Sequence, residues 1–284
     1  MKRIAFGESV QGASHKRNET ECQDSMKKVE FEDGSVILAV ADGHGSKACP
    51  FSKSGSGIAV NVFCKVMQEF YTGYKDDLEL LLTYLNREGD TKVAQAVDEE
   101  WKRRVLIAHT KNKRDVPHTS DGEKDKAEIY KEYGTTLVGL MITPIFLFAF
   151  QIGDGDITYV DNTGVEEVLA ADKILGTETH SLSKADAWKK AITIVRRRTV
   201  DEKTPALFML STDGFANSYK NGDEFKKTCI DYFEMIQQHG CEVVGVNLKS
   251  WLCETSEQGC GDDITLLMCY IAKDAGKCED KKNE

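Results

Sequence analysis

Four aspartates stand beside apolar segments that lie far apart in the sequence, and three of them come directly before a glycine. They are Asp42 after VILAVA, Asp154 after PIFLFAFQIG, Asp213 after ALFMLST and Asp262 before DITLL. A single Asp-Gly pair usually marks only a turn at the end of a strand. Strands packed in sheets bring their ends together, however, and two carboxylates about 4 Å apart repel by ~4 kcal/mol at an effective dielectric constant of about 20. Four such acids therefore predict a positive group among them.

The ligands that these positions offer are all oxygen atoms, because the sequence has no cysteine or histidine pair at metal-ligand spacing. Oxygen ligands select hard cations such as magnesium or manganese over zinc. Several aspartates in one cleft could hold two ions, which clamp a phosphoryl oxygen and lower the pKa of a bridging water. Gly43 has no side chain, so its carbonyl could face an ion and a substrate could come close.

Short β-branched or aromatic runs predict the strands that position these acids. The runs cover residues 35–41, 135–142, 145–152, 157–161, 206–211 and 264–271. Between residues 135 and 169 the turns are too short for a crossover helix, which requires antiparallel pairing there. An α+β fold, with sheets covered by helices on their outer faces, fits this order best.

Apolar residues at helical spacing predict the helices that cover these sheets. Four of the stripes cover residues 58–70, 93–105, 225–236 and 243–252. A further helix is expected to begin at Ser183, with Asp186 closing a capping box, and to continue to Val195.

Composition and charge limit the class of protein. The 284 residues are 40% hydrophobic, which is enough for a core, and the net charge of −10 disfavours a broad nucleic-acid surface. No apolar run predicts a signal peptide or a membrane helix, and the 9 cysteines contain no zinc or redox pair, so we expect a reducing cytoplasm. We expect one catalytic domain over 1–272, with a mobile loop over 110–126, and a charged, disordered tail over 273–284.

Six motifs resemble those of the PPM-type, or type 2C, metal-dependent protein serine/threonine phosphatases, in their bacterial-like branch. In chain order they are GASHKRNETECQDS, ADGHGS, EYGTTLVGL, IGDGD, LSTDGF and GDDITLL, and they span about residues 6–271. Each motif is weak alone, but six in the family's order are specific. The resemblance implies a central antiparallel β-sandwich flanked by helices on both sides, in four αββα layers, and a phosphorylated protein as substrate.

The resemblance also implies magnesium or manganese as cofactor, with two ions expected and a third in bacterial members. Asp42 would bridge the two ions, and Gly43 would contribute its carbonyl oxygen. Asp213 and Asp262 would complete the shell of the first ion. Asp154 would lie at the third, weaker ion.

Further residues complete the site that the resemblance implies. Asp24 would order metal-bound water or lie near it. His44 could be the general acid for the leaving serine oxygen, and the alternative is that it only hydrogen-bonds its loop. Where many members place a phosphate-binding arginine, this chain has Ser-His-Lys-Arg, so His15 or Arg17 would bind phosphate, with a structural role as the alternative for His15. Gln23 replaces a glutamate of many eukaryotic members, so the second ion would depend more on water.

The predicted reaction is one-step hydrolysis of phosphoserine or phosphothreonine, in which a metal-bridging hydroxide attacks phosphorus in line and the alcohol leaves. Two alternatives stay open: a metal-dependent hydrolase of another phosphate monoester, and a catalytically silent, phosphatase-like binding module. The Ser-Arg that usually follows Gly-Asp is replaced by Gly155-Asp156, which would add an acid at the rim. We expect a monomer that binds neither nucleic acid nor membrane.

Overall fold

The computed structural model describes residues 2–118, 125–169, 179–198 and 205–272. The strands are β1 (Arg3–Val10), β2 (Ser25–Glu30), β3 (Val36–Ala41), β4 (Leu137–Ile142), β5 (Phe146–Ile152), β6 (Asp156–Asp161), β7 (Gly164–Leu169), β8 (Ile192–Arg197), β9 (Ala206–Ser211) and β10 (Ile264–Ile271). The α-helices are α1 (Ala13–Arg17), α2 (Ser52–Tyr74), α3 (Leu78–Glu88), α4 (Ala94–Lys111), α5 (Lys126–Glu132), α6 (Asp213–Ala216) and α7 (Gly222–Gln258). A π-helical turn (Gly89–Val93) precedes α4, and a 3-10 turn (Ala187–Lys190) precedes β8.

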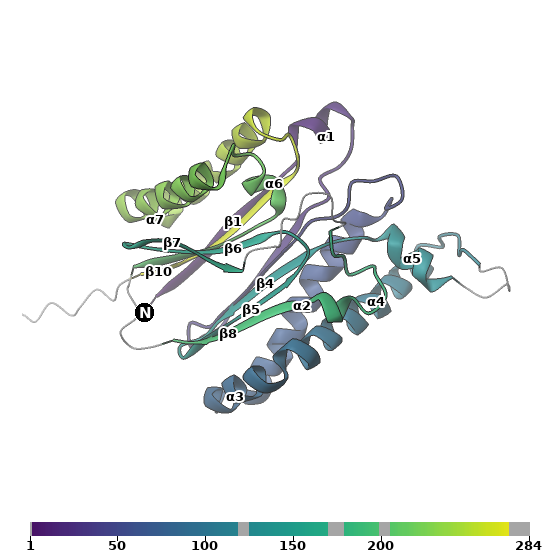
Figure 1. Cartoon of the computed structure of the whole chain (residues 1–284), viewed down its shortest axis with the longest axis horizontal. Helices are drawn as coiled ribbons and strands as arrows, with labels where there is room; N and C mark the ends of the chain where they lie inside the picture. The colour runs from purple at the N-terminus through teal and green to yellow at the C-terminus, as the bar shows by residue number, and fades with distance from the viewer. Residues whose placement is uncertain (1, 119–124, 170–178, 199–204, 273–284) are drawn as a thin grey trace, which may run out of the picture.

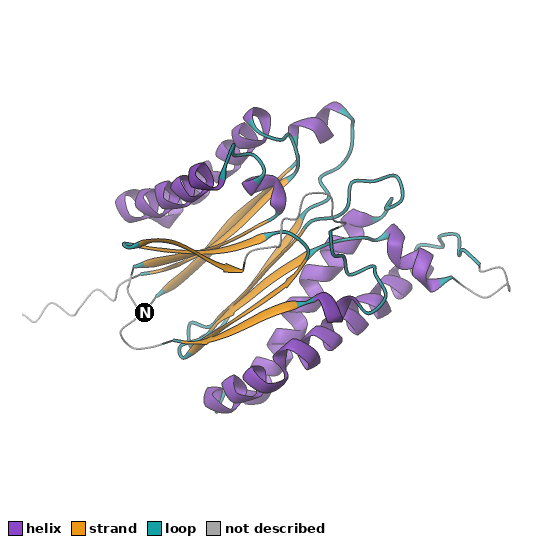
Figure 2. Ribbon diagram, in the orientation of Figure 1, coloured by secondary structure: helices purple, strands orange, loops and turns teal. Residues whose placement is uncertain are grey.

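Two five-stranded sheets lie face to face, and helices cover the outer face of each (Figures 1 and 2). One sheet has the strand order β1-β10-β9-β6-β7, and the other has the order β2-β3-β4-β5-β8. Neighbouring strands pair antiparallel in both sheets. The predicted α+β class and the four-layer helix–sheet–sheet–helix order are therefore confirmed.

The alternation of side chains along the strands divides the core into layers. In β3, Leu38 and Val40 face the other sheet, whereas Ile37 and Ala39 face the helices on the outer side. This alternation is the period of two that a strand imposes on its side chains. Because both faces of β3 are buried, its sequence is continuously apolar, and each fully buried Leu, Ile or Val side chain contributes about 1.5–3 kcal/mol.

The outer helices bury the stripes that the sequence predicts. α2 and α4 pack on the sheet that contains β3, where Val62, Val97 and Trp101 are fully buried. α7 packs on the other sheet through residues that include Phe233 and Leu248. α7 is broken at Gly240, whose φ of 84° and ψ of 160° are not helical, so the two helices predicted over 225–236 and 243–252 are two segments of α7.

The predicted helix that begins at Ser183 is wrong. Asp186 has a left-handed φ of 52° and makes no capping hydrogen bond with its side chain, and the chain then forms the 3-10 turn and strand β8. β8 pairs with the edge of β5, with Val195 opposite Phe148. The run Ile-Thr-Ile-Val at the start of β8 is β-branched, which favours a strand once an unpaired sheet edge is within reach.

The loop predicted over residues 110–126 is shorter than expected in the described part. Thr110 and Lys111 are the last residues of α4, and Lys126 is the first residue of α5. Residues 119–124 and the predicted tail over 273–284 lie outside the described residues.

The fold brings the predicted site to one end of the sandwich. β3 and β5 are both antiparallel to β4, so their C-terminal ends lie at the same end of the sheet. In the other sheet, β9 ends where its antiparallel neighbour β10 begins. These strand ends lie on the side of the sandwich that carries α1 and α6 (Figure 1), so the acids that follow or precede the strands are brought close together.

Candidate active site

The backbone of Asp42 is fixed by two threonines just before β4. The Asp42 carbonyl oxygen accepts hydrogen bonds from Thr136 N (2.8 Å) and from Thr135 Oγ1 (2.7 Å), and Asp42 N donates to Thr136 Oγ1 (3.1 Å). These contacts give the two threonines a supporting role, because they bond only to the main chain of Asp42. They hold the carboxylate at the tip of β3 without using either of its oxygens.

The Asp42 carboxyl group lies among other acids. Although part of the residue reaches solvent, burial of the carboxyl raises its pKa well above the ordinary value, and the negative charges of four more aspartates raise it further. In decreasing order of effect, these are Asp24, Asp213, Asp262 and Asp154. The structure therefore gathers the other four predicted acids around the carboxylate of Asp42, so that acids from five segments of the chain lie together.

Asp24 is almost fully buried, and burial raises its pKa from 3.8 to about 7. Hydrogen bonds from Thr212 and Thr265 lower this pKa, whereas the charges of Asp263 and Asp213 raise it. Thr212 Oγ1 donates to Asp24 Oδ2 at 2.7 Å, while Asp24 Oδ1 is buried with no hydrogen-bond partner. A buried carboxylate oxygen without a partner is costly unless a ligand contacts it.

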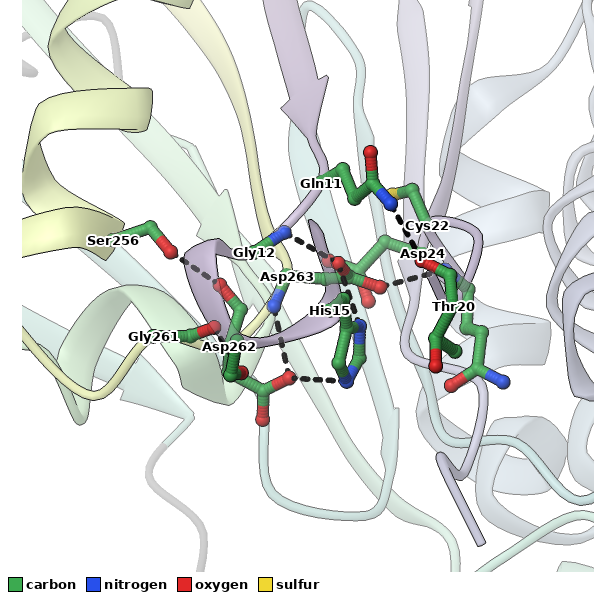
Figure 3. Close-up of polar contacts among 12 residues, drawn as sticks. Gln11, Gly12, His15, Thr20, Cys22, Asp24, Ser256, Gly261, Asp262 and Asp263 are labelled. Carbon is green, nitrogen blue, oxygen red and sulfur yellow. Dashed lines mark hydrogen bonds and ion pairs between the residues drawn. The ribbon is translucent and has the colours of Figure 1, made fainter. Parts of the chain in front are cut away.

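Asp262 and Asp263 are joined to the first motif through His15 (Figure 3). His15 Nδ1 lies 2.9 Å from Asp263 Oδ1, and His15 Nε2 lies 3.5 Å from Asp262 Oδ1. Asp263 also accepts hydrogen bonds from Gly12 N (2.7 Å) and Gln23 N (2.6 Å). The carboxylate of Asp263 therefore ties the start of α1 and the segment before β2 to the start of β10.

The two predicted phosphate-binding residues are placed differently. His15 is partly buried against Asp262 and Asp263, a position that also fits the structural role considered for it. Arg17 is exposed at the C-terminal end of α1.

Asp213 and Asp154 each accept a hydrogen bond from a nearby polar side chain. Asn217 Nδ2 donates to Asp213 Oδ2 at 2.9 Å within α6 and its C-cap. Thr179 Oγ1 donates to Asp154 Oδ2, also at 2.9 Å. Both carboxylates are oxygen donors that could also contact a cation.

Close packing of the neighbouring main chain requires a glycine at position 43, whether or not a ligand binds there. A Cβ atom at this position would lie 2.8 Å from the carbonyl oxygens of Gln23 and Ser52, which is too close for a side chain. The next residue, His44, donates its backbone N–H to Gly134 O at 3.0 Å. The DGHG loop is thereby held against the segment that leads into β4.

The expectation of an additional acid at the rim is wrong for Asp156. This residue is only 5% exposed and opens β6, where it pairs with Ser211. A Cβ at Gly155 would lie 2.6 Å from Ser211 O, so glycine allows a tight passage from β5 in one sheet to β6 in the other.

The donor set fits hard divalent cations. It consists of carboxylate oxygens with excess negative charge, and both Asp24 Oδ1 and Gln23 Oε1 are buried without a partner. In the described ranges, no three His, Cys, Asp or Glu side chains gather tightly enough to hold a metal ion as they stand. The aspartates therefore surround the site and do not form a closed cage, so water would have to supply ligands, as magnesium usually requires.

Sequence reasoning gave no role to Asp263, Thr212 and Thr265, although all three hold the predicted site together. Two of them adjoin residues that it did select, because Thr212 precedes Asp213 and Asp263 follows Asp262. Their partners lie about two hundred residues away along the chain, and no local pattern reports such contacts.

The comparisons with known proteins agree with this fold and site. Several solved structures have a similar fold. PstP, a serine/threonine protein phosphatase whose catalytic domain was solved with 2 manganese ions, matches with a TM-score of 0.54 at 12% identity, over 95% of this chain and 99% of that one. PppA, a regulatory component of the type VI secretion system of Pseudomonas aeruginosa, matches with a TM-score of 0.57 at 14% identity, over 95% and 99% of the two chains. RsbX, solved with magnesium, matches with a TM-score of 0.52 at 13% identity, over 95% and 96%. At such low identity these likenesses show a shared fold.

The sequence also matches a protein family model over most of its length. Residues 11–253 match the family described as Protein phosphatase 2C, which covers most of the sequence. The chain therefore belongs to the protein phosphatase 2C family, a family of serine/threonine protein phosphatases, and the resemblance seen in the sequence is confirmed. The search of curated proteins found no match. Among the described helices, none has the length and apolar character needed to span a membrane.

Proposed function

We propose that this chain hydrolyses phosphoserine and phosphothreonine in phosphorylated proteins, with two magnesium or manganese ions and a third at lower affinity. Asp42, the Gly43 carbonyl, Asp213 and Asp262 would hold the two ions, and Asp154 would lie beside the third. One observation carries this proposal. The Asp42 carboxyl is buried with four further aspartates near it: burial raises its pKa most, and their charges raise it further, which is a concentration of negative charge that divalent cations would neutralise.

The ions, when bound, supply a water of lowered pKa as nucleophile and neutralise the phosphoryl oxygens. The residues of the chain do the rest. Thr135 and Thr136 fix Asp42 through its backbone, so its carboxylate need not be reordered when ligands bind. Asp24, held on one oxygen by Thr212, would orient water with the other.

The proton needed by the departing serine oxygen is assigned to His44. Its loop is held by the hydrogen bond from His44 N to Gly134 O, two residues from Asp42. The imidazole would donate a proton to the serine oxygen as the bond to phosphorus breaks, giving the alcohol and inorganic phosphate. His15 or Arg17 would contribute positive charge to phosphate binding from the first motif.

The choice of metal follows the donor chemistry and agrees with two structural neighbours. PstP was solved with manganese and RsbX with magnesium. Both are hard cations that prefer oxygen ligands.

The test is a substrate panel assayed with manganese and then with chelator. We expect hydrolysis of phosphoserine and phosphothreonine peptides, loss of activity with chelator, and slower turnover of nucleotides and sugar phosphates. Preference for a nucleotide or sugar phosphate would instead identify a hydrolase of small phosphate esters. Binding of phosphopeptides without turnover in manganese would identify a silent binding module.

We also propose that the protein acts as a monomer in a reducing cytoplasm, over a catalytic domain that spans residues 1–272, and binds neither nucleic acid nor membrane. The described cysteines are free thiols, which suits a reducing compartment, and the net charge is −10. Sedimentation at several concentrations would test the monomer, since a second, heavier species at working concentration would contradict it.

A further inference from the structure

A pocket of about 480 Å³ lies beside His44. Three segments form its walls: the DGHG loop, helix α5, and the chain from Thr179 to Ala185. The polar lining includes His44, Ser46, Lys131, Thr179, Ser183 and Lys184, and alanines of all three segments complete the walls. A volume of this size accommodates one or two side chains of a bound peptide.

The pocket is fixed to the aspartate cluster by hydrogen bonds on two sides. On one side, Thr179 Oγ1 donates to Asp154 Oδ2 at 2.9 Å. On the other, Ser181 Oγ exchanges hydrogen bonds of 3.2 Å with Thr135 N and O, and Thr135 Oγ1 in turn donates to Asp42 O. A peptide whose phosphate reaches Asp42 therefore passes next to this pocket.

The described lining of the pocket has more lysines than acids, in contrast to the aspartate cluster beside it. Lys131 from α5 and Lys184 from the third segment line it, in a chain of net charge −10 and beside five aspartates. Among the lining residues that the structure describes, the acid is Glu128, which lies 3.1 Å from Lys131 Nζ. That ion pair is half exposed, with the Lys131 side chain 54% accessible, so it contributes little stability and a bound anion can replace Glu128 as the partner of Lys131.

We propose that this pocket binds an anionic side chain of the substrate close to the phosphoserine or phosphothreonine, either a carboxylate or a second phosphate. The inference rests on the proposed function and adds a substrate class to it: acidic or multiply phosphorylated sites. Lys131 and Lys184 are then specificity-determining residues, because they contact the flanking side chain and not the reacting phosphate.

The experiment compares phosphopeptides that differ only in the residues around one phosphoserine: glutamate, a second phosphoserine, glutamine or lysine, moved along each side. For the wild-type protein in manganese, we expect kcat/KM for the best glutamate peptide to exceed that for the lysine peptide by about tenfold, the effect of roughly 1.4 kcal/mol. Lys131→Glu and Lys184→Glu should each reduce this ratio by about tenfold. Glu128→Gln should increase it, because it removes the carboxylate that competes for Lys131.

Lys126→Glu is the matched control, since Lys126 is an exposed lysine of the same helix that does not line the pocket. It should leave the ratio unchanged. A larger effect with a second phosphoserine than with glutamate would identify multiply phosphorylated sites as the substrates. Equal kcat/KM for all peptides, or equal losses for Lys126→Glu and Lys131→Glu, would overturn the inference.

Failure of the pocket and failure of the proposed function give different results. An aryl phosphate has no flanking residues, so its hydrolysis in manganese reports the aspartate cluster alone. If the protein hydrolyses the aryl phosphate and hydrolyses all peptides equally well, only the proposed anion-binding role of the pocket is contradicted. If no substrate is hydrolysed, both the proposed phosphatase activity and the proposed anion-binding pocket are contradicted.

Discussion

Asp263 and Asp24 are two buried carboxylates at the same end of the sandwich, and they differ in how completely the protein satisfies their hydrogen-bonding capacity. Asp263 accepts a hydrogen bond on each oxygen, from Gly12 N and from Gln23 N, and His15 Nδ1 lies 2.9 Å from one of these oxygens. Asp24 has one oxygen on Thr212 and the other without a partner, and its pKa is raised to about 7. The hydrogen bonds thus separate an acid that serves the fold from one that is available to a ligand.

Asp42 belongs with Asp24 in this comparison. Its backbone is held by Thr135 and Thr136, while burial and neighbouring charges raise the pKa of its carboxyl. Position is therefore secured by main-chain hydrogen bonds, and charge is left uncompensated by the protein. A site for divalent cations needs both a fixed main chain and carboxylate charge that the protein itself does not neutralise.

The largest effect is expected for Asp42→Asn, which removes the central carboxylate and keeps its shape. Loss of several kcal/mol of transition-state stabilisation corresponds to a decrease in kcat/KM of about a thousandfold or more. Because the substitution also removes charge repulsion, the metal-free variant should unfold at a temperature no lower than that of the wild type. Asp223→Asn, at an exposed position in the first turn of α7, is the control and should change neither value. Full activity of Asp42→Asn would contradict the assignment.

In contrast to Asp42→Asn, which should lower activity without lowering stability, Asp263→Ala should strongly lower stability. It leaves the buried N–H groups of Gly12 and Gln23 without their acceptor, at about 1.5 kcal/mol or more each, or roughly 3 kcal/mol in total. The melting temperature should fall by roughly 10 °C, and saturating manganese should not restore it. Thermal unfolding with and without manganese checks this. A variant as stable as the wild type would show that Asp263 does not hold the motifs together.

Substitution of Arg114 tests whether residues beyond Thr135 and Thr136 help to position Asp42 and His44. Its guanidinium lies 3.4 Å from the centre of the Phe51 ring and donates to the hydroxyl of Tyr133, which precedes the segment that holds His44 and Asp42. Arg114→Ala should lower kcat by about tenfold with little change in KM, because small displacements of reacting groups are costly. Arg114→Lys retains the charge without the planar fork, so it should recover only part of the loss. An unchanged kcat in both variants would confine the support to Thr135 and Thr136.

The smallest effect concerns pH. A carboxyl whose folded-state pKa is raised stabilises the folded state fully below its unfolded pKa, near 3.8, and this contribution is lost as pH rises through about 7 for Asp24. The Asp24→Asn variant does not lose stability in this way, because the asparagine side chain does not titrate. In chelator, its melting temperature relative to wild type should therefore increase by a few degrees between about pH 4 and pH 8. A constant difference across that range would mean that the pKa of Asp24 is not raised.

Much of the fold could be predicted because the apolar runs that become β3, β5, β9 and β10 are buried on both faces and read as strands in any context. The error at β8 has a physical cause. Residues 183–195 carry both a helical stripe and a β-branched run, and the free edge of β5 decides between them only after the sheet has formed. β1 and β2 mix polar with apolar residues and lie at sheet edges, so their periodicity is weak.

Four acids of the site, Asp42, Asp154, Asp213 and Asp262, could be predicted for a similar reason, since each stands at the end of a strand with a strong apolar signal. Asp24 precedes the weak strand β2, so only the motif resemblance pointed to it. The structural role of Asp263 could not be predicted. It depends on contacts with Gly12 and Gln23, which are 251 and 240 residues away and come together only through the pairing of β1 with β10. His15 likewise gained its position between two acids from tertiary packing alone.

Anomalous diffraction from crystals grown with manganese tests most directly whether the aspartates gather around divalent cations. We predict two strong peaks in direct contact with the Asp42 carboxylate, one of them also next to Asp213 and Asp262, with Asp263 still bonded to Gly12 and Gln23. Peaks only elsewhere on the protein, with none at Asp42, would contradict the proposed metal centre.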